Sequence, residues 1–176
     1  GQSRELNEDM LVIADAERAS VIAGIMGGLE SEITSQTTDI LLECANFSGP
    51  GIMRTENALG LRSESSTRYE KGLDPEMIGA ALDLACGLLA QVCGGQVSTG
   101  TVDVRIPPLP QTKVDLRGRR IEQVLGLSIP PDKVTSVLAA LGCGITRAAE
   151  DFMVAVPSFR ADLQREIDLI EEVARI

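Results

Sequence analysis

Short apolar runs near the start of the chain alternate with polar turns. Residues 10–15 and 20–25 are rich in Val, Ile and Leu and are separated by a polar turn, which predicts two adjacent strands. Residues 39–45 form a third run that is apolar almost throughout. Such a run is typical of a strand covered on both faces, so the single acid inside it, Glu43, needs a reason to be there.

A helix is predicted from residue 74 to the glycine pair Gly94-Gly95. Asp74 is a good N-cap, Pro75 suits the first turn, and Glu76 lies near the positive helix end. Apolar residues follow at helical spacing, and these are Ile78, Ala81, Leu82, Ala85, Leu89 and Val92.

The second half of the chain shows a different order of elements. Residues 113–116 predict a strand, 119–125 and 132–141 predict helices that end at glycines, and 145–147 with 152–156 predict a hairpin. Between the halves, the proline-rich stretch 106–110 cannot continue a helix and is the natural linker. We therefore expect two small domains, at residues 1–105 and 106–176, in an α+β fold whose second domain is of winged-helix type.

The last predicted helix, residues 160–176, separates acids from apolar residues. An apolar stripe is predicted at Leu163, Ile167, Ile170 and Ala174. Asp168, Glu171 and Glu172 are predicted on the other side, with Asp162 at the start of the first turn. Close carboxylates repel one another, so this pattern predicts either a hydrated surface or a site for a hard divalent cation. The helix reaches Ile176 without a stop signal, and we expect the chain to be part of a longer protein.

Composition narrows the chemistry. The chain has no histidine, so catalysis or metal binding must depend on carboxylates, hydroxyls, backbone dipoles or thiols. Only four aromatic residues are present, and the net charge of −10 gives neither half the basic excess of a stand-alone nucleic-acid binder. The four cysteines form no C-x-x-C pair, and we expect buried free thiols. The absence of a long apolar run or signal-like start predicts a soluble protein without a membrane partner.

Three segments together resemble the beta subunit of bacterial phenylalanyl-tRNA synthetase. They are residues 23–28 (Ala-Gly-Ile-Met-Gly-Gly), residues 41–45 leading to 61–75, and residues 157–162 (Pro-Ser-Phe-Arg-Ala-Asp) with the acidic helix. The resemblance spans nearly the whole chain. It implies that residues 1–105 are the later part of a mixed-sheet domain that hydrolyses tRNA wrongly charged with tyrosine. Residues 106–176 would then be the neighbouring winged-helix-like domain.

The resemblance also implies partners and cofactors. The family forms a cytoplasmic heterotetramer of two alpha and two beta subunits that charges phenylalanine tRNA with the use of ATP. ATP and phenylalanine bind to the alpha subunit, so we expect no synthetic active site on this chain. Mg²⁺ would be shared with the alpha subunit through Asp162, Asp168, Glu171 and Glu172, against the alternative that these acids form a solvated surface.

The same resemblance names an editing pocket. Glu43 would recognise the hydroxyl of a misacylated tyrosine, because phenylalanine would leave a buried carboxylate unpaired. The alternative is an ordinary ion pair between Glu43 and a nearby arginine, which would be Arg54, Arg62 or Arg68. The other expected pocket residues are Gly24, Gly27, Ser63 and Ser65, and Ser65 departs from the alanine that is typical of the family.

Two other functions stay open at this point. A basic cluster at Arg117, Arg119 and Arg120 could contact the tRNA backbone in the complete enzyme, although the near-neutral charge of this half favours a solvated surface. The whole chain could also be a non-catalytic RNA- or protein-binding module that reuses the editing-domain fold. Such a module would need no alpha subunit and would hydrolyse no tyrosyl-tRNA.

Overall fold

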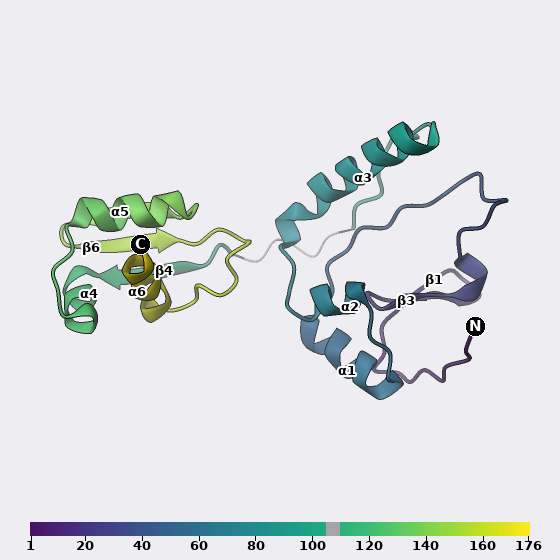
Figure 1. Cartoon of the computed structure of the whole chain (residues 1–176), viewed down its shortest axis with the longest axis horizontal. Coiled ribbons are helices and arrows are strands. Elements are labelled where there is room, and N and C mark those ends of the chain that lie inside the picture. The colour runs from purple at the N-terminus through teal and green to yellow at the C-terminus, as the bar shows by residue number, and fades with distance from the viewer. Residues whose placement is uncertain (105–109) are drawn as a thin grey trace. The chain divides into compact units, whose positions relative to one another are not determined.

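The computed structural model describes residues 1–104 and 110–176 (Figure 1). The chain divides into two compact units, Gly1–Ser98 and Thr99–Ile176, which we call the N-terminal and C-terminal units. Both units combine helices with a three-stranded sheet, which confirms the α+β class. Four of the five residues of the predicted linker at 106–110, and the boundary placed before it, lie outside the described residues.

The N-terminal unit begins with a small antiparallel sheet. Its strands β1 (Val12–Ala14), β2 (Ala19–Ile22) and β3 (Met26–Gly27) pair in chain order. The first two strands confirm the pair predicted from the two apolar runs, and β3 is an addition. A short 3-10 helix, η1 (Leu29–Ser31), follows.

Two helices in this unit were not predicted. Helix α1 (Gly49–Leu59) starts at Gly49-Pro50-Gly51, a sequence typical of turns, although proline is also favoured in a first helical turn. Helix α2 (Glu64–Tyr69) is short and rich in serine. Its local signal is the Ser63-x-x-Ser66 spacing, in which each residue's hydroxyl accepts a hydrogen bond from the other's backbone N–H.

The strand predicted at residues 39–45 is wrong. This segment has no regular secondary structure, and Leu41 at its centre is 99% exposed. A strand needs a neighbour to pair its backbone groups, and no described residue provides that ladder. Apolar composition alone therefore did not make this segment a strand.

The predicted helix after residue 74 is confirmed as a 3-10 turn, η2 (Pro75–Met77), followed by α3 (Ile78–Cys93). One side of α3 is half-buried, and none of its residues is fully buried. By length and hydropathy, Pro75–Cys93 is the one described helix that could cross a membrane. Core helices of water-soluble domains pass the same test, and Asp83 interrupts the apolar run, so we assign it no membrane role.

The C-terminal unit has the predicted order of elements. Strands β4 (Lys113–Arg117), β6 (Asp151–Ala155) and β5 (Gly144–Ala148) form an antiparallel sheet with β6 in the middle. Helices α4 (Gly118–Leu125), α5 (Pro131–Ala140) and α6 (Glu166–Arg175) complete the unit (Figure 1). Strands β5 and β6 are joined by a tight turn in which Ala149 has a φ of 55°.

The core of the C-terminal unit is continuous. It contains Leu116 and Val154 from the sheet, Leu138 from α5 and Leu169 from α6, all of them fully buried. Contacts of α6 with β4, α4 and α5 hold this last helix against the core. The position of α6 matters for function because it carries three of the four predicted metal ligands.

The final helix starts later than predicted. Residues 157–165 are irregular, so Asp162 precedes the helix instead of lying in its first turn. The predicted apolar stripe is also rotated, because Ile167 is 44% exposed and Ala174 is exposed. The buried side of α6 consists of Leu169, Ile170, Glu172 and Val173.

The cysteines are all free, as predicted. Cys143 is buried in the C-terminal core, and burial raises the pKa of its thiol. The expectation of burial is wrong for Cys93, which is exposed at the end of α3, because the described residues leave this end of the helix uncovered.

Candidate functional site

The first part of the candidate site is the turn between β2 and β3. Gly24 lies at its centre with a φ of +69°, a conformation that favours glycine. A Cβ atom at this position would come within 2.9 Å of Ile52, 3.0 Å of Phe47 and 3.1 Å of Tyr69. Both the backbone conformation and the close packing therefore require glycine at residue 24.

Gly27 differs from Gly24. It lies in β3 opposite Val21, and a Cβ atom built on it would meet no other atom within 4 Å. The structure therefore gives no packing reason for glycine at residue 27. Any need for the absence of a side chain there would come from a bound molecule.

Ser63 connects this turn to α2. Its hydroxyl donates a hydrogen bond of 2.8 Å to the backbone carbonyl of Ile25, one residue after Gly24. The same oxygen accepts a hydrogen bond of 3.0 Å from the backbone N–H of Ser66 and so caps α2. The two hydrogen bonds of the Ser63 hydroxyl therefore join the turn to α2, whereas Ser65 is exposed on α2.

Ser66 is a residue of this region that sequence reasoning missed. It is fully buried, and its hydroxyl donates to the carbonyl of Ser63 at 3.1 Å. Together with the hydrogen bonds to the two backbone N–H groups, this fixes the loop that enters α2. The serine spacing described above was the signal that could have identified it.

Glu43 lies in the irregular segment before α1. The expectation of a buried carboxylate is wrong for this chain, because the Glu43 side chain is exposed. Partial desolvation nevertheless raises the pKa of Glu43 above its ordinary value. After desolvation, its negative charge contributes in turn to the raised pKa of Tyr69.

The predicted alternative for Glu43 was an ion pair with arginine. Arg62 instead pairs with Glu70 at 2.8 Å, and Arg68 pairs with Glu64 at 2.9 Å. Within the described parts of the chain, desolvation alone accounts for the shifted pKa of Glu43. Arg62 and Arg68 are therefore committed elsewhere, and among the described residues no ion pair joins Glu43 to Arg54 either, so its carboxylate is available to an external donor.

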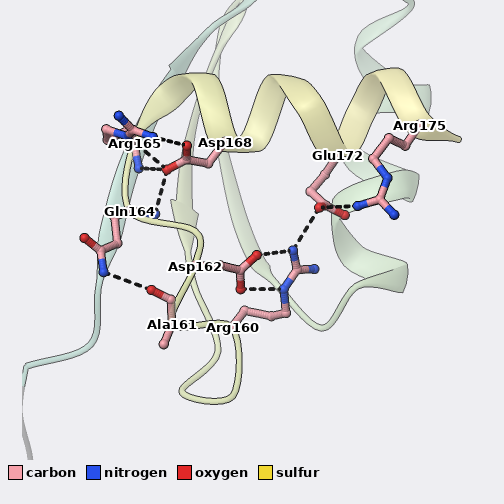
Figure 2. Close-up of polar contacts among 8 residues, drawn as sticks. All are labelled: Arg160, Ala161, Asp162, Gln164, Arg165, Asp168, Glu172 and Arg175. Carbon is pink, nitrogen blue, oxygen red and sulfur yellow. Dashed lines mark hydrogen bonds and ion pairs between the residues drawn. The ribbon is translucent and has the colours of Figure 1, made fainter. Parts of the chain in front are cut away.

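The second candidate group is the acidic cluster before and within α6 (Figure 2). Arg160 binds Asp162 through two hydrogen bonds of 2.9 and 2.7 Å, and its Nη2 also donates to Glu172 at 2.9 Å. This pairing lowers the pKa of Asp162 and raises the pKa of Arg160. Arg175 adds a longer contact of 3.4 Å to the same oxygen of Glu172.

Asp168 is held separately at the start of α6. Its carboxylate accepts hydrogen bonds from the backbone N–H groups of Arg165 at 2.8 Å and Gln164 at 3.1 Å. The Arg165 guanidinium binds the same carboxylate at 2.9 Å and is the main cause of the lowered pKa of Asp168. Glu171 is exposed.

These contacts decide how well the four acids suit a metal ion. Asp162, Asp168 and Glu172 direct their oxygens at arginines and backbone N–H groups (Figure 2). Among residues 1–104 and 110–176, no group of three or more His, Cys, Asp or Glu could hold a metal ion. The acids therefore do not fit a magnesium site within this chain alone, and the predicted site shared with an alpha subunit stays a prediction.

One arginine of the basic cluster forms an ion pair within the C-terminal unit. Arg117 forms two hydrogen bonds with Glu166, at 3.0 and 2.6 Å, and its backbone N–H donates to the same carboxylate. Arg117 is thereby the main cause of the lowered pKa of Glu166. This leaves Arg119 and Arg120 as exposed cations, which agrees with the solvated-surface interpretation.

Comparison with known proteins assigns both units. Residues 1–94 match the family described as the B3/4 domain, and residues 114–176 match the tRNA synthetase B5 domain. The whole chain is 44% identical to the phenylalanine–tRNA ligase beta subunit of Moorella thermoacetica and 44% identical to that of Geobacter metallireducens. The chain belongs to the phenylalanine–tRNA ligase beta subunit family.

The chain spans only part of the length of the relatives that it matches. The beta subunit of Methylococcus capsulatus is 42% identical over 177 residues. The match covers all of this chain but 22% of the length of each of the three relatives. The resemblance predicted from three sequence segments is thus confirmed for the family of phenylalanine–tRNA ligase beta subunits.

Proposed function

We propose that this chain is the part of a phenylalanine–tRNA ligase beta subunit that supports proofreading and subunit assembly. In the whole cytoplasmic enzyme it would act with an alpha subunit, in a heterotetramer of two alpha and two beta subunits that binds phenylalanine tRNA. ATP and phenylalanine would be used on the alpha subunit. The observation that carries the proposal is the match of residues 1–94 to the B3/4 domain. The identity of 44% to a named beta subunit over the whole chain supports it.

We place the proofreading pocket around the β2–β3 turn. Ser63 is hydrogen-bonded to the carbonyl of Ile25, and Gly24 packs against Tyr69, whose pKa also responds to the charge of Glu43. The contacts of Ser63 and Gly24, together with the hydrogen bond from Tyr69 to the carbonyl of Ala45, two residues after Glu43, support this placement. Gly27 and Ser65 would contribute space and an exposed hydroxyl at its edge.

In this pocket Glu43 would discriminate tyrosine from phenylalanine. A carboxylate free of arginine can accept a hydrogen bond from the phenol of a misacylated tyrosine. Phenylalanine offers no donor, so its binding would leave the carboxylate desolvated without compensation. A site of this kind rejects the analogue that lacks the hydroxyl far more strongly than a purely apolar pocket can.

The decisive experiment measures hydrolysis of tyrosine-charged phenylalanine tRNA by the full-length beta subunit assembled with its alpha partner. Wild type is compared with Glu43→Ala and with Glu32→Ala, which removes an exposed carboxylate of the same unit. We expect Glu43→Ala to slow clearance at least about tenfold, the scale of one lost charged hydrogen bond, with unchanged charging by phenylalanine. The Glu32→Ala enzyme should behave as wild type.

Two outcomes would contradict the proposal. Absence of clearance by the wild-type enzyme, despite normal aminoacylation, would favour the non-catalytic binding module. Equal losses of clearance and aminoacylation in Glu43→Ala would point to a folding defect in place of a recognition defect.

A further inference from the structure

The irregular segment after Glu43 is fixed by contacts of three successive residues. The carbonyl of Ala45 accepts a hydrogen bond of 3.1 Å from the hydroxyl of Tyr69. The side-chain amide of Asn46 donates to the carbonyl of Leu73 at 2.8 Å. The ring of Phe47 lies against Tyr69, with 5.0 Å between centroids and planes tilted by 52°.

These contacts matter because the segment has no backbone ladder of its own. Residues 39–47 lie outside any helix or strand. Their positions therefore depend on side-chain contacts that cross 24 to 27 residues of chain. Tyr69 supplies two of the three, one through its hydroxyl and one through its ring.

The same ring also contacts the glycine turn. A Cβ atom at Gly24 would lie 3.1 Å from Cδ2 of Tyr69 and 3.0 Å from Cδ2 of Phe47. Tyr69 thus contacts the turn on one side and the Glu43 segment on the other. It also ends α2, the helix that Ser63 caps at its start.

We propose that Tyr69 is a positioning residue for Glu43: its ring packs on Gly24 and its hydroxyl holds Ala45, so that Glu43 is presented beside the glycine turn. This inference rests on the proposed proofreading function for its consequence in catalysis. The positioning itself is a property of the chain and is measured separately. Phe47 supports the ring of Tyr69 and takes no part in the hydrogen bond.

The roles of the Tyr69 hydroxyl and of the Tyr69 ring can be tested separately. A tyrosine that only fills the core would be replaced by phenylalanine without effect, because the ring and its contact with Phe47 remain. A tyrosine that holds Ala45 loses one hydrogen bond to a backbone carbonyl. A net loss of this size corresponds to roughly a three- to tenfold change in an equilibrium or rate.

The experiment uses the full-length beta subunit assembled with its alpha partner. It compares wild type, Tyr69→Phe and Thr55→Val. Thr55→Val is the matched control, since it removes a hydroxyl that donates to the carbonyl of Gly51 at 3.1 Å within α1 and is 6% exposed. The readouts are amide hydrogen exchange of residues 40–48 and the rates of hydrolysis of tyrosyl- and phenylalanyl-tRNA.

We expect Tyr69→Phe to speed exchange in residues 43–47 and to lower kcat/KM for tyrosyl-tRNA by roughly three- to tenfold. The ratio of tyrosyl- to phenylalanyl-tRNA hydrolysis should fall as well, because a displaced Glu43 loses recognition of the phenol. A merely structural defect would lower both rates equally and leave the ratio unchanged. The Thr55→Val enzyme should keep the wild-type ratio and wild-type exchange in residues 43–47.

Unchanged exchange of residues 43–47 in Tyr69→Phe would overturn the positioning role, whatever the enzyme hydrolyses. An unchanged ratio, in an enzyme whose clearance depends on Glu43, would also overturn it. If wild type clears no tyrosyl-tRNA but Tyr69→Phe still loosens residues 43–47, the proposed function fails and the positioning role stands.

Discussion

At the scale of single residues, the carboxylates show how environment overrides residue type. Glu172 is 8% exposed and contacts the Arg160 guanidinium, whereas Glu43 is exposed and pairs with no arginine of residues 1–104 and 110–176. Glu56 is a third case, since it is 6% exposed and its Oε2 has no hydrogen-bond partner among the described residues. Its nearest cation is Arg62, whose Nε lies 3.9 Å from Oε1. The same side chain is therefore a buried ion-pair partner at Glu172, an exposed acceptor at Glu43 and a buried group with one unpaired oxygen at Glu56.

Arg160 is the residue on which the acidic cluster depends. Replacing it in Arg160→Gln leaves the buried Glu172 with only the longer contact of 3.4 Å to Arg175, and we expect the C-terminal unit to lose about 3 kcal/mol of unfolding free energy. Urea unfolding of the chain, followed by a probe in the C-terminal unit, measures this loss. Arg119→Gln removes an exposed arginine from α4 and should leave the midpoint unchanged. Equal midpoints for Arg160→Gln and wild type would mean that the buried pair contributes no net stability.

At the scale of elements, α6 is defined by how it begins. The Asp168 carboxylate binds two backbone N–H groups that precede the helix, so it acts as a cap from within the first turn. The start of α6 is therefore set by Asp168 and not by Asp162.

Removal of this cap should have a modest and local effect. We expect Asp168→Ala to destabilise the C-terminal unit by about 1 kcal/mol, the usual cost of a lost cap. Circular dichroism during thermal unfolding would record the change as a lower Tm. Glu171→Ala is the matched control, because it removes an exposed carboxylate from the same helix without breaking a cap. A larger loss in Glu171→Ala than in Asp168→Ala would contradict this account of the helix start.

Elements with a complete local signal were predictable from sequence. The β5–β6 hairpin, α4 and α5 combine alternation or helical spacing with a turn or glycine end, and all three form as predicted. Residues 39–45 failed because a strand depends on a partner that composition does not reveal. Helix α2 was missed because serines favour caps and turns over helix interiors.

The candidate site was less predictable than the fold. Resemblance named Glu43 and Gly24, but only the structure shows that Tyr69 contacts the neighbourhood of both. The charge pattern of α6 placed Glu172 on the solvated side, whereas Arg160 draws it into the core side of the helix. An arginine twelve residues away cannot be assigned to a glutamate by helical periodicity, because the intervening loop decides which side they share.

At the scale of the whole molecule, the two units differ in the size of their cores. The C-terminal unit buries a continuous cluster that joins its sheet to all three helices. Among the described residues, the fully buried hydrophobics of the N-terminal unit are Ala23, Ile25 and Ile52. Hydrophobic burial is the main favourable term in folding, so the C-terminal unit should contribute most of the chain's stability.

Glu43 and the acids of the C-terminal unit should also respond to pH in opposite directions. In the C-terminal unit the pKa values of Asp162, Glu166 and Asp168 are lowered by arginines, so their stabilisation is complete above the ordinary carboxyl pKa, above about pH 5. It is lost as the pH falls through the lowered values. Glu43 has a raised pKa, so the folded N-terminal unit binds its proton more tightly and gains stability as the pH falls toward the ordinary value.

Amide hydrogen exchange, corrected for the intrinsic pH dependence of exchange, reads the two units separately in one sample. Between pH 6 and pH 3 we expect protection of β4, β6 and α6 to fall, while protection near Glu43 rises slightly before other carboxylates titrate. Glu43→Gln should abolish the rise and leave the fall unchanged, because the pKa values of Asp162, Glu166 and Asp168 are lowered by arginines of the C-terminal unit itself. Unchanged protection of β4, β6 and α6 between pH 6 and pH 3 would mean that the arginine pairs do not govern the acid response of the C-terminal unit.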